Sequence, residues 1–357
     1  MKVLVRADAS AAIGSGHVSR CLTLVERLQQ RGAVVTFACA EGSATYAARA
    51  HAIPARLVEL PHPVAEFDDP ARPEWLSVAP EDDAAAVLAA VGEERFDWVV
   101  VDHYGLGAPW ETAMRAVADR ILVISDAADR RHDCDALLDQ NLPPGGEEAY
   151  RPLVPAHAEV LAGPRFALLR PEFLETPVPA RVRTELRRVL VSCGGVDVAG
   201  ATACALDGLE GVELDAAVDV VVGARHPQRE AIDARCARRG WTVHVQTERI
   251  AELMRAADIA IGAAGASSWE RCWTGLPSLA LVVAANQQPI ADHLADAGAA
   301  IPVGVPSADA ATRIRSELAS LAGAPERLAA MSRSAAALMR PHRDVADVII
   351  GEARRSA

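Results

Sequence analysis

Short apolar runs alternate with amphipathic segments along almost the whole chain, beginning at the first residues. In the first half, the apolar runs predict strands at Val3–Arg6, Val34–Cys39, Arg56–Leu60, Trp98–Asp102 and Ile121–Ser125. The segments between them predict helices at Val18–Arg31, Ala44–His51, Asp82–Val91 and Trp110–Ala118. This alternation is typical of βαβ units and a parallel sheet.

The alternation is interrupted twice near the middle of the chain. Proline, glycine and charged residues replace the apolar periodicity over Asn141–Pro155 and over Pro171–Pro179. Between the two interruptions, Val160–Leu169 still has the pattern of a short strand and turn. We therefore expect the domain boundary in the second interruption, which gives a first domain of residues 1–175 and a second of residues 176–357.

A second alternating series follows the expected boundary. It predicts strands near Arg188–Ser192, Val218–Val222, Thr242–Val245, Ile259–Gly262, Ser278–Val283 and Ala300–Val303. It predicts helices at Gly200–Leu209, Gln228–Arg239, Ile250–Ala256, Ser268–Thr274 and Ile290–Asp296, then closing helices over 309–321, 325–339 and 345–355. Two such halves predict an α/β protein of the glycosyltransferase-B (GT-B) architecture: two Rossmann-like domains whose parallel sheets face a central cleft, with the ligand at the carboxyl ends of the strands.

Length, composition and charge are consistent with this architecture. A chain of 357 residues suits two domains, and an apolar fraction of 51% with few aromatics suits helices packed on sheets. A formal net charge of -12 argues against nucleic acid as a partner, because a phosphate backbone requires clustered Lys and Arg. An anionic ligand would have to be held locally, by helix N-termini and N–H-rich turns. We expect a monomer or weak dimer.

Cysteine usage and hydropathy indicate a cytoplasmic protein without a membrane span. The seven cysteines are scattered, with no paired or metal-ligand spacing, and are expected to be reduced thiols. The N-terminus has no signal-peptide pattern. The longest charge-free stretch, Cys272–Ala291, contains prolines and polar residues that a spanning helix would not tolerate well.

The first candidate for chemistry is the small-residue loop between the first expected strand and the first expected helix. Gly14 and Gly16 permit a tight turn, and free N–H groups at the helix start can face a ligand. His17 lies at that helix start, where a neutral imidazole can act as a general base. A histidine that only caps the helix or packs on the sheet fits the same spacing. Arg6 and Asp8, at the strand end, share that ambiguity.

Polar residues also follow two later strands of the first half. Asp102 and Tyr104 come at the end of one buried strand, and Asp126 comes at the end of the next. In doubly wound sheets, ligand groups come from such strand ends. The alternative interpretation is that Asp102 caps the next helix, that Tyr104 fills a loop and that Asp126 belongs to a solvated loop.

The second half offers two glycine-containing turns. Gly194-Gly195 follows a strand, and Gly265-Ala266-Ser267-Ser268 opens a helix that carries Glu270. Small residues between a strand and a helix leave N–H donors free for a diphosphate, and a carboxylate one turn into the helix can accept two ribose hydroxyls. A tight connection and a surface carboxylate near a helix start are the alternatives.

These residues together resemble a known family. The pattern R-A-D-A-S-x-x-I-G-x-G-H-V-x-R-C-L-T-L, from Arg6 to Leu24, is similar to the N-terminus of the PseG-type UDP-2,4-diacetamido-2,4,6-trideoxy-β-L-altropyranose hydrolases of pseudaminic acid biosynthesis. The resemblance extends over Val101–Tyr104, Asp133–Asn141, Leu168–Phe173, Val191–Asp197 and Gly265–Gln287, and is weakest over Glu59–Arg95. The C-terminal half is also similar to the nucleotide-sugar domain of MurG-type transferases.

The resemblance implies hydrolysis at C1 of a UDP-sugar with inversion, without a metal or cofactor. It implies that His17 is the general base and that Glu270 binds the ribose, with Thr247–Ile250 along the uracil pocket. The residues expected near the sugar are Arg6, Asp8, Asp102, Tyr104, Asp126 and Gln287. The residues expected at the nucleotide are Gly14, Gly16, Gly194, Gly195, Ile250, Gly265, Ala266, Ser267, Ser268, Glu270 and Asn286.

Three other functions fit parts of the pattern. A glycosyltransferase of the same architecture would pass the sugar to an acceptor, but the first half of this acidic chain has no apolar and basic docking patch. A non-catalytic UDP-sugar-binding protein would not need His17 beside the glycine loop. A UDP-sugar 2-epimerase shares the fold, but its additional carboxylates and histidines have no assigned positions here. The identity of the sugar stays open for two reasons. Some members of the similar family carry a polar residue where this chain has Trp269, and the Ala-rich middle of the chain offers few recognisable sugar contacts.

Overall fold

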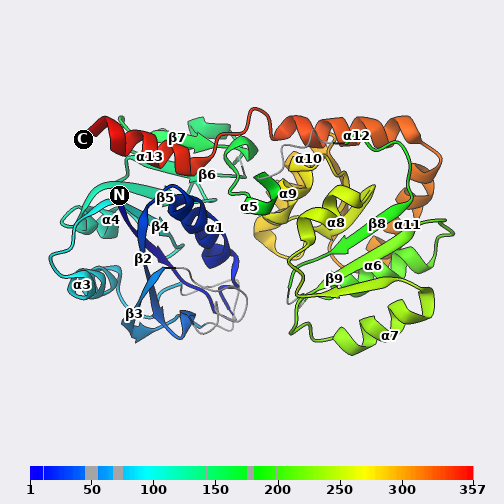
Figure 1. Cartoon of the computed structure of the whole chain (residues 1–357), viewed down its shortest axis with the longest axis horizontal. Helices are drawn as coiled ribbons and strands as arrows, with labels where there is room; N and C mark the ends of the chain where they lie inside the picture. Colours follow the sequence, from blue (N-terminus) through cyan, green and yellow to red (C-terminus); the bar gives the residue numbers. More distant parts are fainter. Residues whose placement is uncertain are drawn as a thin grey trace. The chain divides into compact units, whose positions relative to one another are not determined.

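The computed structural model describes residues 1–10, 12–44, 55–66, 75–141, 143–174, 181–195, 197 and 199–356. The chain forms two compact units (Figure 1). The first comprises Met1–Pro171 and Pro341–Ala357, and the second comprises Glu172–Arg340. The helix predicted at Ala44–His51 lies almost entirely outside the described residues.

The first unit is built on a seven-stranded sheet with the order β3-β2-β1-β4-β5-β6-β7. Every neighbouring pair in this sheet is parallel. Its strands are β1 (Lys2–Ala7), β2 (Val34–Glu41), β3 (Arg56–Pro63), β4 (Phe96–Asp102), β5 (Ala118–Ile124), β6 (Ala136–Asp139) and β7 (Glu159–Ala162). The strand order reverses between β1 and β4, which is where ligand crevices form in doubly wound sheets.

The second unit is built on a six-stranded parallel sheet with the order β10-β9-β8-β11-β12-β13. Its strands are β8 (Arg188–Ser192), β9 (Ala217–Val222), β10 (Thr242–Val245), β11 (Ile259–Ala263), β12 (Ser278–Leu281) and β13 (Ala300–Gly304). The order again reverses beside the first strand, between β8 and β11. Each unit therefore has the Rossmann-like topology that the sequence predicts, with its own switch point.

Helices cover the faces of both sheets. In the first unit they are α1 (Gly16–Gln30), α3 (Pro80–Val91), α4 (Ala108–Met114) and α13 (Val345–Ser356). In the second they are α5 (Pro171–Leu174, which begins at the boundary), α6 (Ala201–Glu210), α7 (Arg229–Arg239), α8 (Ile250–Ala256), α9 (Ser267–Trp273), α10 (Gln288–Asp296), α11 (Ala308–Ala322) and α12 (Pro325–Leu338). Short 3-10 turns occur at Gly146–Ala149, Pro164–Phe166 and Ala285–Gln287.

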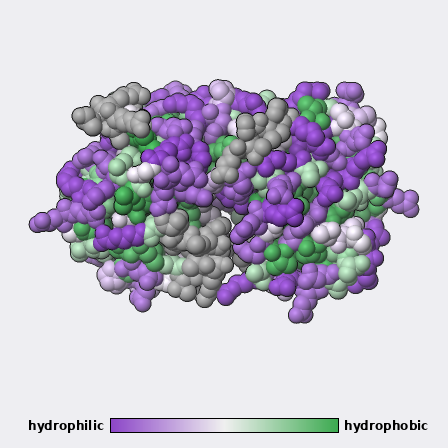
Figure 2. Space-filling model, in the orientation of Figure 1, coloured by the Kyte–Doolittle hydropathy of each residue, from purple (hydrophilic) through white to green (hydrophobic). Residues whose placement is uncertain are grey.

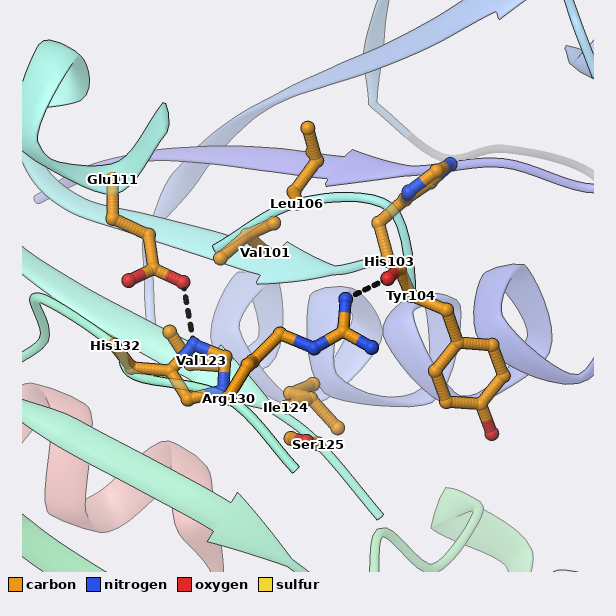
Figure 3. Close-up of a pocket in the computed structure, with 10 residues that line it drawn as sticks. All are labelled: Val101, His103, Tyr104, Leu106, Glu111, Val123, Ile124, Ser125, Arg130 and His132. Carbon is orange, nitrogen blue, oxygen red and sulfur yellow. Dashed lines mark hydrogen bonds and ion pairs between the residues drawn. The ribbon is translucent and has the colours of Figure 1, made fainter. Parts of the chain in front are cut away.

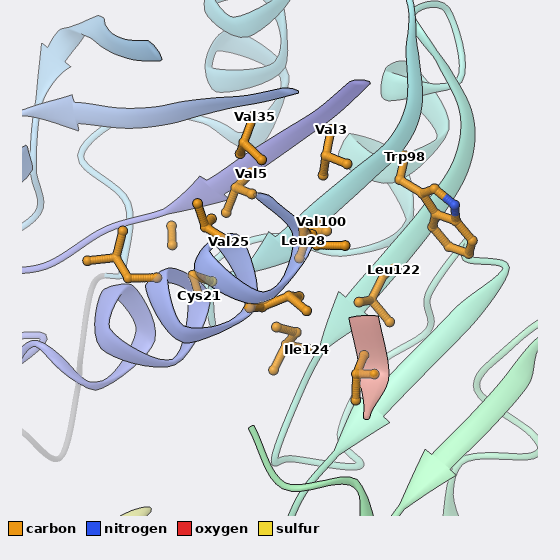
Figure 4. Packing of buried hydrophobic residues seen from close by; sticks show 14 of the residues in the cluster. Val3, Val5, Cys21, Val25, Leu28, Val35, Trp98, Val100, Leu122 and Ile124 are labelled. Carbon is orange, nitrogen blue, oxygen red and sulfur yellow. The ribbon is translucent and has the colours of Figure 1, made fainter. Parts of the chain in front are cut away.

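The first core lies between α1 and one face of its sheet. Apolar residues at Cys21, Val25 and Leu28 follow the three- and four-residue spacing of one helix face and pack on strand residues such as Val5 and Val100 (Figure 4). This packing fixes the start of α1, with His17, above the ends of β1 and β4. The opposite face of the sheet is covered by α3 and α4.

The last helix corrects the predicted extent of the second domain, residues 176–357. Val345, Ala346 and Ile349 of α13 are buried in the core of the first unit, beside α1. Arg27 of α1 and Arg31, which follows the end of that helix, bind Asp344, just before α13, with contacts of 2.8 and 2.7 Å. The chain therefore returns to the first unit after Arg340, and the boundary between the units lies at Pro171/Glu172 rather than after residue 175.

Polar and charged residues dominate the face shown in Figure 2, with apolar residues in scattered small areas. Among the described residues, none of the helices is long and apolar enough to cross a membrane. All seven cysteines are buried and unpaired.

Candidate functional site

The loop between β1 and α1 brings His17 to the switch point of the first sheet. Gly14 has a φ of 80°, a left-handed conformation that favours glycine, and its N–H donates to the Ser10 carbonyl at 2.9 Å. The Ser10 hydroxyl accepts from Ile13 N at 3.1 Å and donates to the Ala65 carbonyl at 3.0 Å. These bonds close the loop, so that α1 begins at Gly16 and its second residue is His17.

His17 forms a pair with Asp102 at the end of β4. The Nδ1 atom of His17 lies 2.6 Å from Oδ1 of Asp102. The imidazole keeps 10% of its side-chain surface exposed, whereas the carboxylate is fully buried. Asp102 is thus buried and paired with the imidazole, and its contact with the sugar stays a prediction.

The charge state of Asp102 determines which nitrogen of His17 is available. Burial disfavours the carboxylate, but the charge of Arg20 and the contact with His17 outweigh burial and hold the pKa of Asp102 well below its usual range. An ionised carboxylate can only accept a hydrogen bond, so the Nδ1–H of a neutral His17 donates to it. The Nε2 atom then carries the lone pair and can accept a proton.

Arg20 completes this cluster and is the residue that sequence reasoning missed. Its Nε lies 2.5 Å from Oδ2 of Asp102, and its Nη2 lies 2.6 Å from Oδ1. Its Nη1 donates to Oδ2 of Asp126 at 3.1 Å. The spacing contained a signal, because residues three apart on a helix share a face and Arg20 is three positions after His17.

Tyr104 packs against the imidazole and is bound in turn to Asp126. The Tyr104 hydroxyl donates to Oδ1 of Asp126 at 2.6 Å. The Tyr104 ring meets the His17 ring edge-on, with centroids 4.6 Å apart. The structure therefore brings together His17, Asp102, Tyr104 and Asp126, four of the residues predicted from the sequence.

Arg6 and Asp8 belong to a buried network of ion pairs. The Arg6 side chain is fully buried, with Nη2 2.6 Å from Oδ2 of Asp83 and Nη1 2.6 Å from Oδ1 of Asp8. Asp8 also accepts from Ala40 N at 2.8 Å and lies 3.2 Å from Nε2 of His103. These bonds hold the ends of the central strands together, and contact of the two side chains with the sugar stays a prediction.

A small cavity lies beside Tyr104, near the ends of β4 and β5 (Figure 3). His132 and Glu111 line it, with Nδ1 of His132 2.7 Å from Oε1 of Glu111. Arg130 donates to the backbone carbonyl of Tyr104. The segment after β5, which resembles a solvated loop in sequence, is therefore anchored from below, and it holds Asp126 in position.

In the second unit, a buried cation of α9 reaches the turn between β11 and α9. This cation is Arg271, a residue that is only 1% exposed. Its Nη2 donates to the Ala263 carbonyl and to the Ser268 hydroxyl, both at 2.8 Å. Its Nη1 donates to the Ser267 hydroxyl at 3.3 Å. In the part of the chain that the structure describes, no salt bridge joins Arg271 to a carboxylate, and its Nε has no hydrogen-bond partner. Burial lowers the pKa of Arg271.

Gln287 lies beside this turn, as expected from the sequence. A methyl group added to Gly265 would come within 3.5 Å of Nε2 of Gln287. The Oε1 of Gln287 accepts from Val283 N at 3.1 Å, which orients the amide. Asn286, next to it, is exposed, and Glu270 and Ile250 are buried near the starts of α9 and α8.

The other glycine turn of this unit, at Gly194 and Gly195, has a carboxylate beside it, whereas the turn before α9 has the Arg271 cation. Asp197 accepts from the backbone N–H groups of Ala201 and Thr202 at 2.8 and 2.7 Å, and lies 3.2 Å from Nε2 of His226. The carboxylate therefore occupies the N-terminus of α6. This cap was not identified from the sequence, and it places a negative charge where a diphosphate was expected to approach.

Comparison with known proteins supports the sequence-based interpretation. The chain is 30% identical over 201 residues to a UDP-2,4-diacetamido-2,4,6-trideoxy-beta-L-altropyranose hydrolase from Campylobacter jejuni, an alignment that covers 56% of this chain and 62% of that relative. It is 25% identical over 313 residues to the spore coat polysaccharide biosynthesis protein SpsG of Bacillus subtilis, covering 85% of this chain and 84% of that one. The chain is similar to the PseG-type hydrolase and spans less than two thirds of its length. Its predicted resemblance to that family is confirmed.

The comparisons also confirm the MurG-type similarity and the fold class. Residues 190–349 match the glycosyltransferase family 28 C-terminal domain. The crystal structure of Acinetobacter baumannii MurG superimposes with a TM-score of 0.62 at 18% identity, covering 98% of this chain and 99% of that one. At this identity the likeness concerns the fold, and it identifies the PseG-like chain as an α/β protein of the GT-B class with two Rossmann-like units.

Proposed function

We propose that this PseG-like protein is a UDP-sugar hydrolase that releases UDP and the free sugar, with inversion at C1. The observation that carries the proposal is the His17–Asp102 pair, with Nδ1 and Oδ1 2.6 Å apart at the switch point of the first sheet. The similarity to a UDP-2,4-diacetamido-2,4,6-trideoxy-beta-L-altropyranose hydrolase supports that sugar nucleotide as the first substrate to test.

In the proposed reaction, His17 activates water. Nε2 takes a proton from a water molecule as the water oxygen attacks C1, and the bond between C1 and the phosphate oxygen breaks with its electron pair leaving on UDP. Asp102 accepts from Nδ1–H throughout and stabilises the imidazolium that forms. The imidazolium then returns its proton to solvent. Attack opposite to the leaving group accounts for inversion without a covalent intermediate.

The second unit is proposed to bind UDP. Glu270 would accept the ribose hydroxyls, Ile250 would lie along the uracil, and the Gly265–Ser268 turn would meet the diphosphate. Ser267 suits this role because its hydroxyl oxygen accepts from Arg271 at 3.3 Å, which leaves the hydroxyl proton free to donate. Gln287 and Asn286 would contact the sugar and nucleotide. Backbone contacts with the nucleotide stay predicted at Gly14, Gly16, Gly194 and Gly195. The negative charge of Asp197 disfavours a diphosphate at the last two.

A glycosyltransferase is the second candidate. The family 28 match and the MurG-like fold favour it, because those names belong to sugar-transferring proteins. The same His17 could deprotonate an acceptor hydroxyl in place of water. The two candidates differ only in what attacks C1, and the choice between them is experimental.

The test is UDP release from a panel of UDP-sugars, including the diacetamido-trideoxy-altrose derivative, without any added acceptor and with or without EDTA. The proposal predicts release that resists EDTA and that inverts C1 by NMR. Release that appears only after an acceptor alcohol is added would identify a transferase, and tight UDP binding without turnover under either condition would identify a binding protein.

A further inference from the structure

One guanidinium group joins the two halves of the His17 cluster. Arg20 contacts both oxygens of Asp102, through Nε at 2.5 Å and Nη2 at 2.6 Å, in a two-pronged arrangement. Its third nitrogen, Nη1, reaches Asp126 at 3.1 Å. Only 10% of the Arg20 side-chain surface is exposed. A planar guanidinium can make these contacts simultaneously, whereas a lysine ammonium is a single point charge.

The contact with Asp102 changes what that carboxylate does to His17. A buried carboxylate with no other partner would strongly favour the protonated imidazolium beside it. Here Oδ1 of Asp102 is shared between His17 and Arg20, and Oδ2 faces Arg20 and the Cys21 thiol. Because Arg20 already neutralises Asp102, the imidazole can keep its hydrogen bond to the carboxylate without having to be charged.

The contact between Arg20 and Asp126 acts on the His17 ring through Tyr104. Asp126 is held by Arg20 and by the Tyr104 hydroxyl, and the Tyr104 ring packs edge-on against His17. Titratable or charged groups near the imidazole include Asp102, His103 and Tyr104 at the end of β4, Asp126 after β5, and Arg20 and Cys21 on α1. Arg20 is the cation in contact with the ring, with its Nη2 3.2 Å from Nδ1 of His17.

We propose that Arg20 is a positioning residue: it binds Asp102, which contacts His17, and Asp126, which holds Tyr104 against His17, and so it keeps the imidazole neutral, with Nε2 free to accept a proton. The inference rests on the proposed function of His17 as a base, which it deepens. Without the guanidinium, the two carboxylates would favour the imidazolium, and the base would be lost at neutral pH.

The experiment is a pH titration of His17 by NMR in the full chain with labelled histidine, with the His17 signals assigned by their loss in His17→Gln. In Arg20→Met the midpoint of the His17 titration is expected to rise by about one pH unit or more. Turnover at pH 7 is expected to fall about three-fold or more and to recover as the pH is raised. Arg27→Met is the matched control, because Arg27 is also on α1 and also grips an aspartate, Asp344, through Nε and Nη2.

Arg20→Lys covers the case in which Arg20→Met does not fold. This variant keeps the positive charge but loses the planar guanidinium that binds two carboxylates at once. The midpoint of the His17 titration should therefore rise by less than in Arg20→Met. A midpoint that does not move in whichever of these variants folds, or that moves equally in Arg27→Met, would overturn the proposal. The NMR result is independent of turnover: a moved midpoint in a protein without any UDP-sugar hydrolysis would leave the Arg20 assignment standing and refute the proposed function instead.

Discussion

The two candidate regions differ in how they treat charge. In the first unit, Arg6 is balanced by Asp8 and Asp83, and Arg20 by Asp102 and Asp126, so each buried cation has two carboxylate partners. In the turn between β11 and α9, Arg271 is buried among hydroxyl and carbonyl groups, with no described carboxylate bound to it.

The difference suggests a division of labour. A site whose cations are already neutralised is suited to moving a proton to or from a neutral group, because its charges hold one another in place. A buried cation that donates only to hydroxyl and carbonyl groups is stabilised further when an anion arrives. The first region is therefore suited to the sugar and water, and the second to a diphosphate.

The largest expected effect comes from removing the base. His17→Ala should lower the turnover of UDP-sugar about 10²–10⁴-fold, the usual contribution of a general base. UDP affinity, measured by calorimetry, should stay at the wild-type value, because the side chains proposed to bind the nucleotide belong to the other unit and the predicted contacts of the first unit, at Gly14 and Gly16, are with the backbone. A loss of UDP affinity equal to the loss of turnover would break the division between the two regions.

Asp139 is a buried carboxyl group at the end of β6, and within the part of the chain that the structure describes no salt bridge joins it to a cation. Burial raises its pKa to about 6, although the backbone N–H of Asn141 and the Tyr150 hydroxyl donate to it. The folded state therefore holds this proton more tightly than the unfolded state, and the stability that the proton confers is lost as the pH rises from about 4 through 6.

Asp139→Asn, which cannot ionise, should gain stability relative to wild type over that pH interval, by up to about 3 kcal/mol. Urea unfolding of both proteins at pH 4 and pH 7 measures the gain. A difference between the two proteins that stays constant with pH would show that Asp139 titrates normally.

On the nucleotide side, Glu270→Ala should weaken UDP binding by about 1.5–3 kcal/mol, the usual size of a hydrogen bond to a charged group. Turnover at saturating substrate should change much less. Glu270→Gln, which keeps the size and one acceptor oxygen, should fall between the two. If UDP affinity does not respond to either substitution, Glu270 has no contact with the ribose.

The smallest expected effect is that of Arg271→Met. Loss of the buried cation should weaken UDP binding by about 1 kcal/mol, roughly five-fold, while binding of uridine, which has no phosphate, should change little. Calorimetry with both ligands separates a charge effect from a general loosening of the turn. An equal loss for uridine and UDP would mean that Arg271 supports only the shape of the turn.

The fold was largely predictable because apolar periodicity determines parallel strands and the helices between them. The prediction failed where tertiary contacts decide: the four-residue strand β6 has too short an apolar run, and α13 packs on the first unit through Val345 and Ile349, which sequence distance cannot reveal.

The candidate site was predictable in part. The ends of parallel strands meet at one edge of a sheet, and this brings together His17, Asp102, Tyr104 and Asp126. Arg20 was missed although its helical spacing from His17 was visible. The burial of Arg6 beside Asp8 depends on its second partner, Asp83, which lies 77 positions away in the chain, and no local pattern predicts such a pair.

The most direct test of the central claim, that His17 activates water for attack at C1, is hydrolysis of the UDP-sugar in ¹⁸O-labelled water. The products are analysed by mass spectrometry at early times, beside free sugar incubated in the same water to correct for exchange at C1. The account predicts label in the sugar and none in UDP, with both products lost in His17→Ala. Label in UDP would mean attack at phosphorus, and undiminished release by His17→Ala would mean that another group activates the water; either result would contradict the account.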